Sequence, residues 1–314
     1  MRSNLALAVR TLALSVVLAA GAAQSAPSPG ADRSAHDAGA VDGGALQMAI
    51  LGRLRGDRGA GNCLDLSEVG DRDVQRNAGA IRAAGLCVTA DGFSEQGYDW
   101  RFTIISNPKA RRGPVWYLPH DDESEAFDAA VYAVARYGGR LVAVDGNEGR
   151  NYRGIDPNRH FAVSAQDARP CAMRGPAPQY TRYVMGLFRG ARHIFSMHNN
   201  TRGGGVTVNV NTNKVRGFQA SGRFSDPDHL VYIASRRPLS QDRDARALRD
   251  KLLGAGLSVV HETVTRQNSD CSFSNHVALH DRRDYFNIEA VHGSTLQKAM
   301  VDTLLATLGY RPVR

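Results

Sequence analysis

The side chains best suited to chemistry are concentrated between residues 114 and 161. His120 and Glu123 stand three positions apart, directly after an apolar run and at the start of a helical pattern. A residue at a strand end and another in the next helical turn can point at one centre, and imidazole and carboxylate are both ordinary zinc ligands. An HxxE pair alone is weak evidence, because acidic residues also favour helix N-termini. The metal hypothesis therefore requires a third ligand and matching catalytic groups elsewhere.

Two later residues are candidates to complete such a centre. His198 follows an apolar strand-like run, just as His120 does, so it is the best candidate for the third ligand. Glu289 lies among apolar residues, where a carboxylate needs a partner and acquires a raised pKa. Such surroundings suit a general base. The alternative for Glu289 is a salt bridge to Arg282 or Arg283.

A third group of residues offers hydrogen-bond donors for an anion. Asn158 and Arg159 place an amide beside a planar guanidinium fork, which suits a carboxylate. A surface ion pair is the alternative for this arginine. Arg153 or Arg150 could add a second cation that stabilises an oxyanion beside the metal.

The order of these groups along the chain is more specific than any one of them. His-x-x-Glu, Asp-x-Asn-Arg, a strand-end His and a strand Glu follow one another between His120 and Glu289. This order resembles the zinc carboxypeptidase superfamily, which includes the aspartoacylases and the succinylglutamate desuccinylases. The resemblance implies that His120, Glu123 and His198 bind one zinc ion and leave a position for water. It implies that Glu289 takes a proton from that water and passes it to the leaving amine.

The same resemblance implies roles for the residues around the centre. Asn158 and Arg159 would hold the carboxylate of the substrate. Arg153 resembles the arginine that polarises the oxyanion, with Arg150 as its rival. Asp156 resembles the acid that orients a zinc-bound imidazole.

The chain departs from the family pattern at two points that bear on the substrate. Asn199 follows the third ligand, where peptidases of the family usually carry a small residue. The interval from His120 to Asn158 is short for a digestive-type carboxypeptidase and is nearer to that of the deacylase-like branches. Tyr285 is a candidate for the family's substrate-pocket tyrosine.

The first functional hypothesis is an exported, zinc-dependent amide hydrolase. It would be a metallocarboxypeptidase that releases the C-terminal residue of peptides, with cell-wall (peptidoglycan) peptides as candidate substrates. One alternative is an N-acyl amino acid deacylase of the same superfamily. Another is a non-catalytic envelope domain that binds peptides and keeps the fold.

These side chains require a scaffold that brings several strand ends together, and the chain alternates between strand-like and helical patterns. This alternation predicts one α/β domain with a mixed, twisted sheet and helices on both faces. Ligands of open α/β sheets bind at the carboxyl ends of the strands. The expected strands cover residues 100–106, 115–118, 141–144, 193–197, 206–210, 231–234, 259–264 and 284–290, and the expected helices cover 46–55, 74–84, a stretch ending at Gly138, 180–188, 242–253 and 294–308.

The composition of the N-terminal region indicates that the protein is exported. Residues 1–26 have the basic start, short apolar stretch and small residues of a secretory signal peptide. Residues 27–44 read as a flexible linker and 45–314 as the catalytic domain, of which 45–112 form the N-terminal portion. We therefore expect a periplasmic or secreted protein with no stable membrane span after signal cleavage.

Cysteines and charge add two further expectations. Export makes disulfides plausible, and of the three pairings that four cysteines allow we favour Cys63–Cys87 and Cys171–Cys271, by proximity in sequence. The chain carries a formal charge of +8. It has no basic block of five residues and no aromatic-plus-basic motif, so we expect no nucleic-acid partner. The charge suits loose affinity for anionic surfaces.

Overall fold

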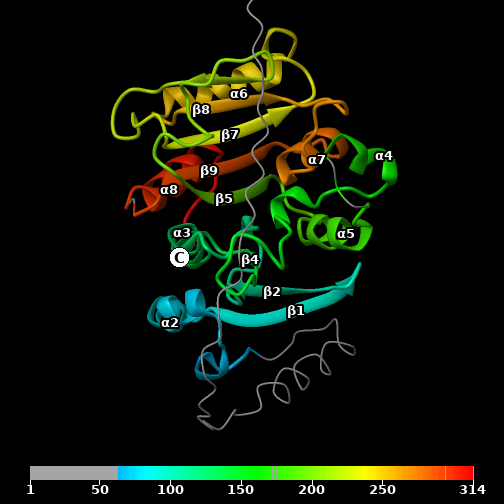
Figure 1. Ribbon diagram of the computed structural model, residues 1–314. Coiled ribbons are helices and arrows are strands. Elements are labelled where there is room, and N and C mark those ends of the chain that lie inside the picture. The colour runs from blue at the N-terminus through cyan, green and yellow to red at the C-terminus, as the bar shows by residue number, and fades with distance from the viewer. Residues whose placement is uncertain (1–62, 172, 174, 294, 314) are drawn as a thin grey trace, which may run out of the picture. The chain divides into compact units, whose positions relative to one another are not determined.

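The computed structural model describes residues 63–171, 173, 175–293 and 295–313 (Figure 1). The expected signal peptide, the linker and the helix at residues 46–55 lie outside this range. The division of the chain into signal peptide, linker and catalytic domain remains a prediction.

The described residues form one mixed sheet of nine strands, in the order β1-β2-β4-β3-β5-β9-β7-β8-β6. Strands β4, β3, β5 and β9 run parallel to one another in the middle of the sheet. Antiparallel pairs flank them on both sides, and the predicted mixed α/β sheet is therefore confirmed. The strands are β1 (Cys87–Glu95), β2 (Tyr98–Ser106), β3 (Val115–Leu118), β4 (Arg140–Val144), β5 (Ile194–Asn200), β6 (Val215–Phe218), β7 (Leu230–Ser235), β8 (Val259–Thr263) and β9 (Tyr285–Val291).

Helices cover both faces of the sheet, as predicted (Figure 1). In β3, Trp116 and Leu118 belong to the core under α2, α3, α6 and α8, whereas Val115 and Tyr117 belong to the core under α5 and α7. Alternate residues of a strand point to opposite faces, so β3 is apolar throughout because both of its faces are buried. The helices are α2 (Arg72–Ala84), α3 (Ser124–Tyr137), α4 (Ala165–Ala168), α5 (Pro178–Leu187), α6 (Arg243–Gly254), α7 (Phe273–His280) and α8 (Gln297–Thr307).

Helix α3 shows why the central unit folds as its sequence predicts. It follows β3 after a short connection, and its apolar residues repeat at helical spacing toward the sheet. It ends at Gly138, whose φ of 76° lies in the region that favours glycine. The next strand, β4, lies parallel to β3 in the sheet.

The strand predicted at residues 206–210 is wrong. Val206, Val208 and Val210 pack on a small apolar cluster with Leu230, so their alternation reflects burial without a strand ladder. The strand in this part of the chain is β6, which follows the valines. The backbone of Val208 packs so closely on Gly217 of β6 that a Cβ at Gly217 would lie 1.8 Å from it. The strands and α-helices that we did not predict are β1, β6, α4 and α7. Helix α8 begins at Gln297, three residues after the predicted start.

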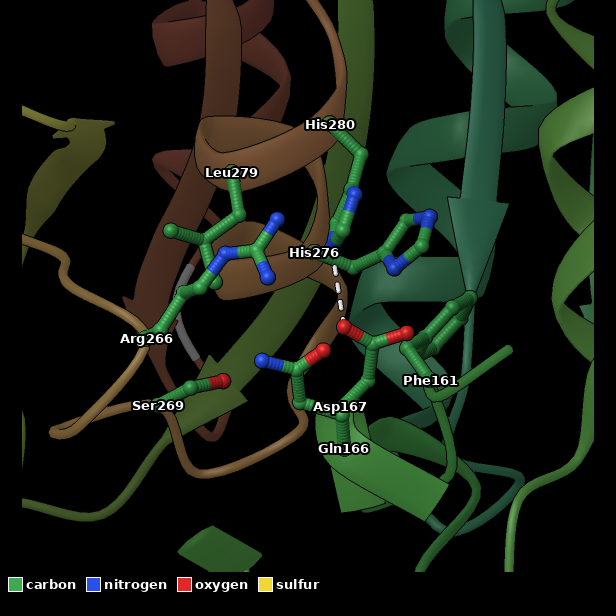
Figure 2. Close-up of a pocket in the computed structure, with 8 residues that line it drawn as sticks. All are labelled: Phe161, Gln166, Asp167, Arg266, Ser269, His276, Leu279 and His280. Atoms are coloured by element: carbon green, nitrogen blue, oxygen red, sulfur yellow. Dashed lines mark ion pairs between the residues drawn. The ribbon is translucent and has the colours of Figure 1, made fainter. Parts of the chain in front are cut away.

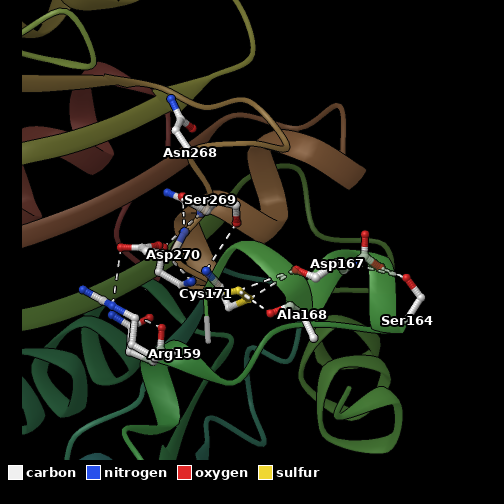
Figure 3. Close-up of a disulfide and its surroundings, with 12 residues drawn as sticks. Arg159, Ser164, Asp167, Ala168, Cys171, Asn268, Ser269 and Asp270 are labelled. Atoms are coloured by element: carbon white, nitrogen blue, oxygen red, sulfur yellow. Dashed lines mark hydrogen bonds and ion pairs between the residues drawn. A yellow bond between two sulfur atoms is a disulfide. The ribbon is translucent and has the colours of Figure 1, made fainter. Parts of the chain in front are cut away.

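Both favoured disulfides are present. Cys63–Cys87 attaches the start of the described chain to β1. Cys171–Cys271 joins the segment after α4 to the loop before α7 (Figure 3). In the described part of the chain, no helix is both long enough and apolar enough to cross a membrane.

Candidate metal centre

Adjacent parallel strands bring the three expected metal ligands to one edge of the sheet. His120 follows the carboxyl end of β3, and Glu123 immediately precedes α3. His198 lies in β5, the parallel neighbour of β3. The strand extends to Asn200, so His198 is within β5 rather than just after it. The carboxyl ends of parallel strands meet at the same edge, which explains the convergence.

The three side chains contact one another directly. His120 Nδ1 lies 2.8 Å from Glu123 Oε1, and His198 Nδ1 lies 3.0 Å from Glu123 Oε2. The two Nδ1 atoms are 3.1 Å apart. All three residues are buried, and among the described residues they form the one group of His, Cys, Asp or Glu able to hold a metal ion.

This arrangement fits a metal ion. Zn–N and Zn–O bonds of about 2.0–2.1 Å in a tetrahedral site place ligand atoms about 3.3 Å apart. The observed separations of 2.8–3.1 Å need only a small expansion to reach that value. Two imidazoles and a carboxylate also match the donor set of catalytic zinc sites, which leave a further position open.

A carboxylate orients the first of these imidazoles. His120 Nε2 lies 2.8 Å from Asp156 Oδ1, so the far side of the ring is held while Nδ1 faces the cluster. Asp156 is itself fixed, because its carboxylate accepts a hydrogen bond from the backbone N–H of Asn158. A carboxylate–histidine pair of this kind fixes the ring orientation and raises the basicity of a metal ligand.

The backbone and two amides hold the other ligands. Asn199 donates its backbone N–H to Glu123 Oε2 at 3.1 Å, and its side-chain oxygen accepts the N–H of Ala126 in the first turn of α3. Gln297 donates to the carbonyl of His198 at 2.8 Å, and its amide oxygen accepts a hydrogen bond from the Asn199 side chain at 3.2 Å. The sequence analysis noted Asn199 only as a departure from a family pattern, and it did not identify Gln297 as part of the site.

Electrostatics within the cluster favour an ionised carboxylate. Burial by itself would raise the pKa of Glu123, but attraction from His198 and a hydrogen bond to His120 outweigh it and hold that pKa below its usual value. Burial would lower the pKa of His120. Its hydrogen bonds to Asp156 and Glu123 prevail, however, and raise the pKa to about 8.

Glu289 lies beside the cluster. Strands β5 and β9 pair in parallel with His198 opposite Glu289. Burial is the main cause of the raised pKa of Glu289, with a further contribution from Glu123, while His198 partly offsets the rise. Its Oε1 accepts a hydrogen bond from the Asn287 side chain at 2.8 Å.

The salt bridge considered for Glu289 is not observed among the described residues. Arg283 instead pairs with Asp281 at 2.6 Å. No ion pair joins Glu289 to Arg282 in the described part of the chain. Among the described residues, Glu289 therefore pairs with no arginine and lies opposite His198.

The two candidate oxyanion arginines occupy different places. Arg150 donates from Nη1 to Glu123 Oε1 at 2.9 Å, with its side chain half exposed. Arg153 is exposed, and its guanidinium lies 5.9 Å from the centre of the Tyr152 ring. The structure therefore brings Arg150 to the cluster and leaves Arg153 outside it.

Asn158 and Arg159 lie on the same loop as Asp156. Asn158 Oδ1 accepts the backbone N–H of Phe273 at 3.1 Å, at the start of α7. Arg159 is exposed and its Nε lies 3.4 Å from Asp270 Oδ2, beside the Cys171–Cys271 disulfide (Figure 3). The surface ion pair considered for Arg159 is thus present, and its exposed guanidinium remains accessible to a second carboxylate.

Tyr285, the candidate substrate-pocket tyrosine, is buried in β9. Its hydroxyl hydrogen-bonds with Ser196 Oγ at 2.6 Å, and its ring packs against Phe273. The side chain forms part of the core under α5 and α7. In this conformation it is not placed to contact a substrate.

A small cavity lies beside α7 (Figure 2). None of its lining residues belongs to the metal cluster. His276 and His280 stack with ring centres 4.6 Å apart, and His280 Nε2 lies 3.7 Å from Asp167 Oδ1. The volume is about 20 Å³, which is room for a single water molecule. This cavity is too small to be a substrate pocket.

Comparison with known proteins gives likeness at the level of structure alone. No family model matches the chain, and no curated protein matches it in sequence. The chain is similar to a metallo-carboxypeptidase of Burkholderia cenocepacia, with 13% identity, 75% of this chain and 69% of that chain covered, and a TM-score of 0.41. It is also similar to an aspartoacylase family protein of Mesorhizobium loti, with 14% identity, coverage of 72% and 68%, and a TM-score of 0.38.

These two proteins carry the names of the two branches to which the sequence resemblance points. Likeness at this level does not assign an activity to the chain. The functional assignment rests instead on the side chains of the cluster and on Glu289.

Proposed function

We propose that this chain is an exported, zinc-dependent amide hydrolase that releases the C-terminal residue of peptides. The observation that carries the proposal is the convergence of His120, Glu123 and His198, with Glu289 in register with His198 on the next strand. The signal-like residues 1–26 motivate export and suggest cell-wall peptides as substrates.

The ligand residues are the first part of the mechanism. His120, Glu123 and His198 would hold one zinc ion, with Asp156 fixing the His120 ring. A zinc ion in such a site lowers the pKa of bound water and polarises a carbonyl oxygen. The buried network of Asn199 and Gln297 keeps Glu123 and His198 in place.

Glu289 is the proposed general base. Its burial raises its pKa, which brings proton affinity toward the value needed to accept a proton from water and return it to the leaving amine. Asn287 holds one of its oxygens, so the other can face the reacting groups. Glu289 stands opposite His198 on the neighbouring strand, so the base lies beside a metal ligand.

Arginines supply the anion contacts. Arg150 sits at Glu123 and would stabilise the oxyanion that develops as the amide carbonyl is attacked. Arg159 and Asn158 would bind the terminal carboxylate of the peptide, with Arg159 exchanging its contact with Asp270 for the substrate.

An N-acyl amino acid deacylase is the second candidate. The short interval between His120 and Asn158 favours it, because that interval is nearer to the deacylase-like branches. The two activities share the metal centre and differ in which side of the amide bond is recognised. Identification of the products by mass separates them.

The test combines metal analysis with hydrolysis of a panel of peptides and N-acyl amino acids by the mature protein. We expect one equivalent of zinc and release of C-terminal residues. Glu289→Gln should retain the zinc and lower kcat by about 10²- to 10⁴-fold.

Absence of bound zinc, or full activity in Glu289→Gln, would refute the proposal. An inactive wild-type protein that still binds peptides would support a non-catalytic envelope domain instead.

A further inference from the structure

A basic groove lies at the N-terminal ends of the central strands, whereas the metal cluster lies at their carboxyl ends. Its walls include Val115 at the start of β3, Arg140 at the start of β4, and Arg192 just before β5. The metal ligands lie at or near the carboxyl ends of β3 and β5, so the length of these strands separates the groove from the cluster. With a volume of about 890 Å³, the groove is far larger than the cavity beside α7.

Six arginines from four separate segments line this groove, and the described residues that line it include no Asp or Glu. They are Arg111, Arg112, Arg140, Arg189, Arg192 and Arg311. No lysine lines it. Such a density of one charge sign in a concave surface focuses the positive potential and attracts anions.

These guanidinium groups are not neutralised by carboxylates within the described part of the chain. None of the six takes part in an ion pair there, although ten other arginines pair with Asp or Glu. Arg140 donates to the carbonyl of Leu187 and Arg192 to that of Leu308. Asp284 attracts Arg192 from outside the groove lining. The groove thus keeps almost all of its positive charge.

We propose that this groove binds a linear, base-free polymer of phosphate groups, such as a phosphodiester-linked chain. A large hollow with cations from four segments of the chain suits a polymer with a charge on each repeat. The planar fork of arginine, used here without any lysine, matches phosphate oxygens in pairs.

The lining does not favour single-stranded nucleic acid. Binding of that kind uses aromatic rings on which bases stack. The lining tyrosines are both engaged: Tyr137 is buried with its hydroxyl bonded to Asp302, and the ring of Tyr310 packs against His193 and Phe195. A flat anionic membrane surface is also a poor match, because the guanidinium groups surround a hollow.

The groove is independent of the proposed hydrolase activity. Because it lies at the other edge of the sheet, a bound polymer would leave the metal cluster open. Binding would hold the protein on a phosphate-rich polymer while the cluster remains accessible to other molecules.

The experiment measures binding of long-chain inorganic polyphosphate to the full chain over a range of salt concentrations. We expect saturable binding that weakens as salt rises. Arg111→Gln/Arg112→Gln and Arg189→Gln/Arg192→Gln should each weaken binding on the order of tenfold and lower the salt slope by about 1 to 2.

The matched control is Arg223→Gln/Arg236→Gln, which removes two exposed arginines outside the groove and should leave binding unchanged. Equal loss in the control and in the groove variants would overturn the proposal. So would tighter binding to phosphatidylglycerol vesicles or to single-stranded DNA, or equal competition by polyglutamate. Circular dichroism and thermal unfolding of each variant establish that folding is intact.

Discussion

At the scale of single residues, the position of a side chain in the backbone decides whether it can serve the site. Arg153 and Gly154 form the tip of a tight turn between Tyr152 and Ile155, which exchange backbone hydrogen bonds. Both tip residues have positive φ, 48° and 85°, and Arg153 is exposed. Arg150 precedes this turn and reaches Glu123.

This difference in position predicts that only the substitution of Arg150 lowers kcat. Arg150→Gln should lower kcat by about 10²-fold, because it removes a charged donor aimed at the developing oxyanion. Arg153→Gln should leave kcat within about twofold of wild type, since Arg153 is exposed and its guanidinium lies near the Tyr152 ring rather than at the cluster. Steady-state kinetics and zinc content of both variants provide the measurement. Loss of kcat in Arg153→Gln alone would reverse the assignment.

At the scale of elements, the start of α8 supports the end of β5. Gln297 is buried and joins the carbonyl of His198 to the side chain of Asn199. Asn199 in turn caps an N–H group in the first turn of α3, next to Glu123. Two helices and a strand are thus coupled directly behind the metal ligands.

Removal of this amide should weaken metal binding. Gln297→Leu removes one hydrogen bond from the buried carbonyl of His198 and one from the buried amide of Asn199, which costs about 1–3 kcal/mol of stability. We expect zinc affinity to fall about tenfold, as for other groups that hold metal ligands. Chelator competition measures the affinity. Lys298→Leu, at the exposed next position of α8, is the control, and an equal loss of affinity in it would rule out a specific role for Gln297.

The two disulfides should contribute unequally to stability. Their cysteines are 100 and 24 residues apart, and in the chain-entropy model the longer loop gives about 1 kcal/mol more stabilisation. Cys171→Ala/Cys271→Ala should therefore lower the free energy of unfolding more than Cys63→Ala/Cys87→Ala. Urea denaturation of both variants tests this order. The opposite order would mean that local packing outweighs loop closure.

At the scale of the whole molecule, buried histidines couple the fold to pH. Four histidines have a pKa of about 4, well below the ordinary value of 6.5, and burial is the main cause in each. They are His160, His193, His261 and His276. Between pH 6.5 and 4 the unfolded chain therefore binds more protons at these sites than the folded chain does. Their contribution to stability is complete above pH 6.5 and is lost as the pH falls toward 4.

These four histidines should therefore make a destabilising contribution that grows as the pH falls below 6.5. We expect the midpoint of urea unfolding to decrease as the pH is lowered from 7.5 to 5.5. His261 alone should account for on the order of 1 kcal/mol at pH 5.5. His261→Gln, which can retain the contact with Ser235, should show a shallower decline. A variant with the same pH dependence as wild type would exclude His261 from this effect.

The sequence by itself determined the central strand–helix–strand unit and the set of side chains suited to a metal centre. The β3 and α3 patterns are local, since strand alternation, helical spacing and the glycine at the helix end act over a few residues. The pairing Cys63–Cys87 also followed from short separation. The same reliance on local patterns produced the wrong strand at 206–210. Valines that pack on a small apolar cluster there alternate as the residues of a strand do.

The tertiary structure alone decided which distant groups meet. Arg150 rather than Arg153 reaches the cluster because a turn with positive φ carries Arg153 to the surface. Gln297 joins the site through the packing of α8, and the six groove arginines gather from four segments through the parallel order of β4, β3 and β5. Such convergence depends on which strands are neighbours in the sheet, and no short-range pattern in the chain encodes that order.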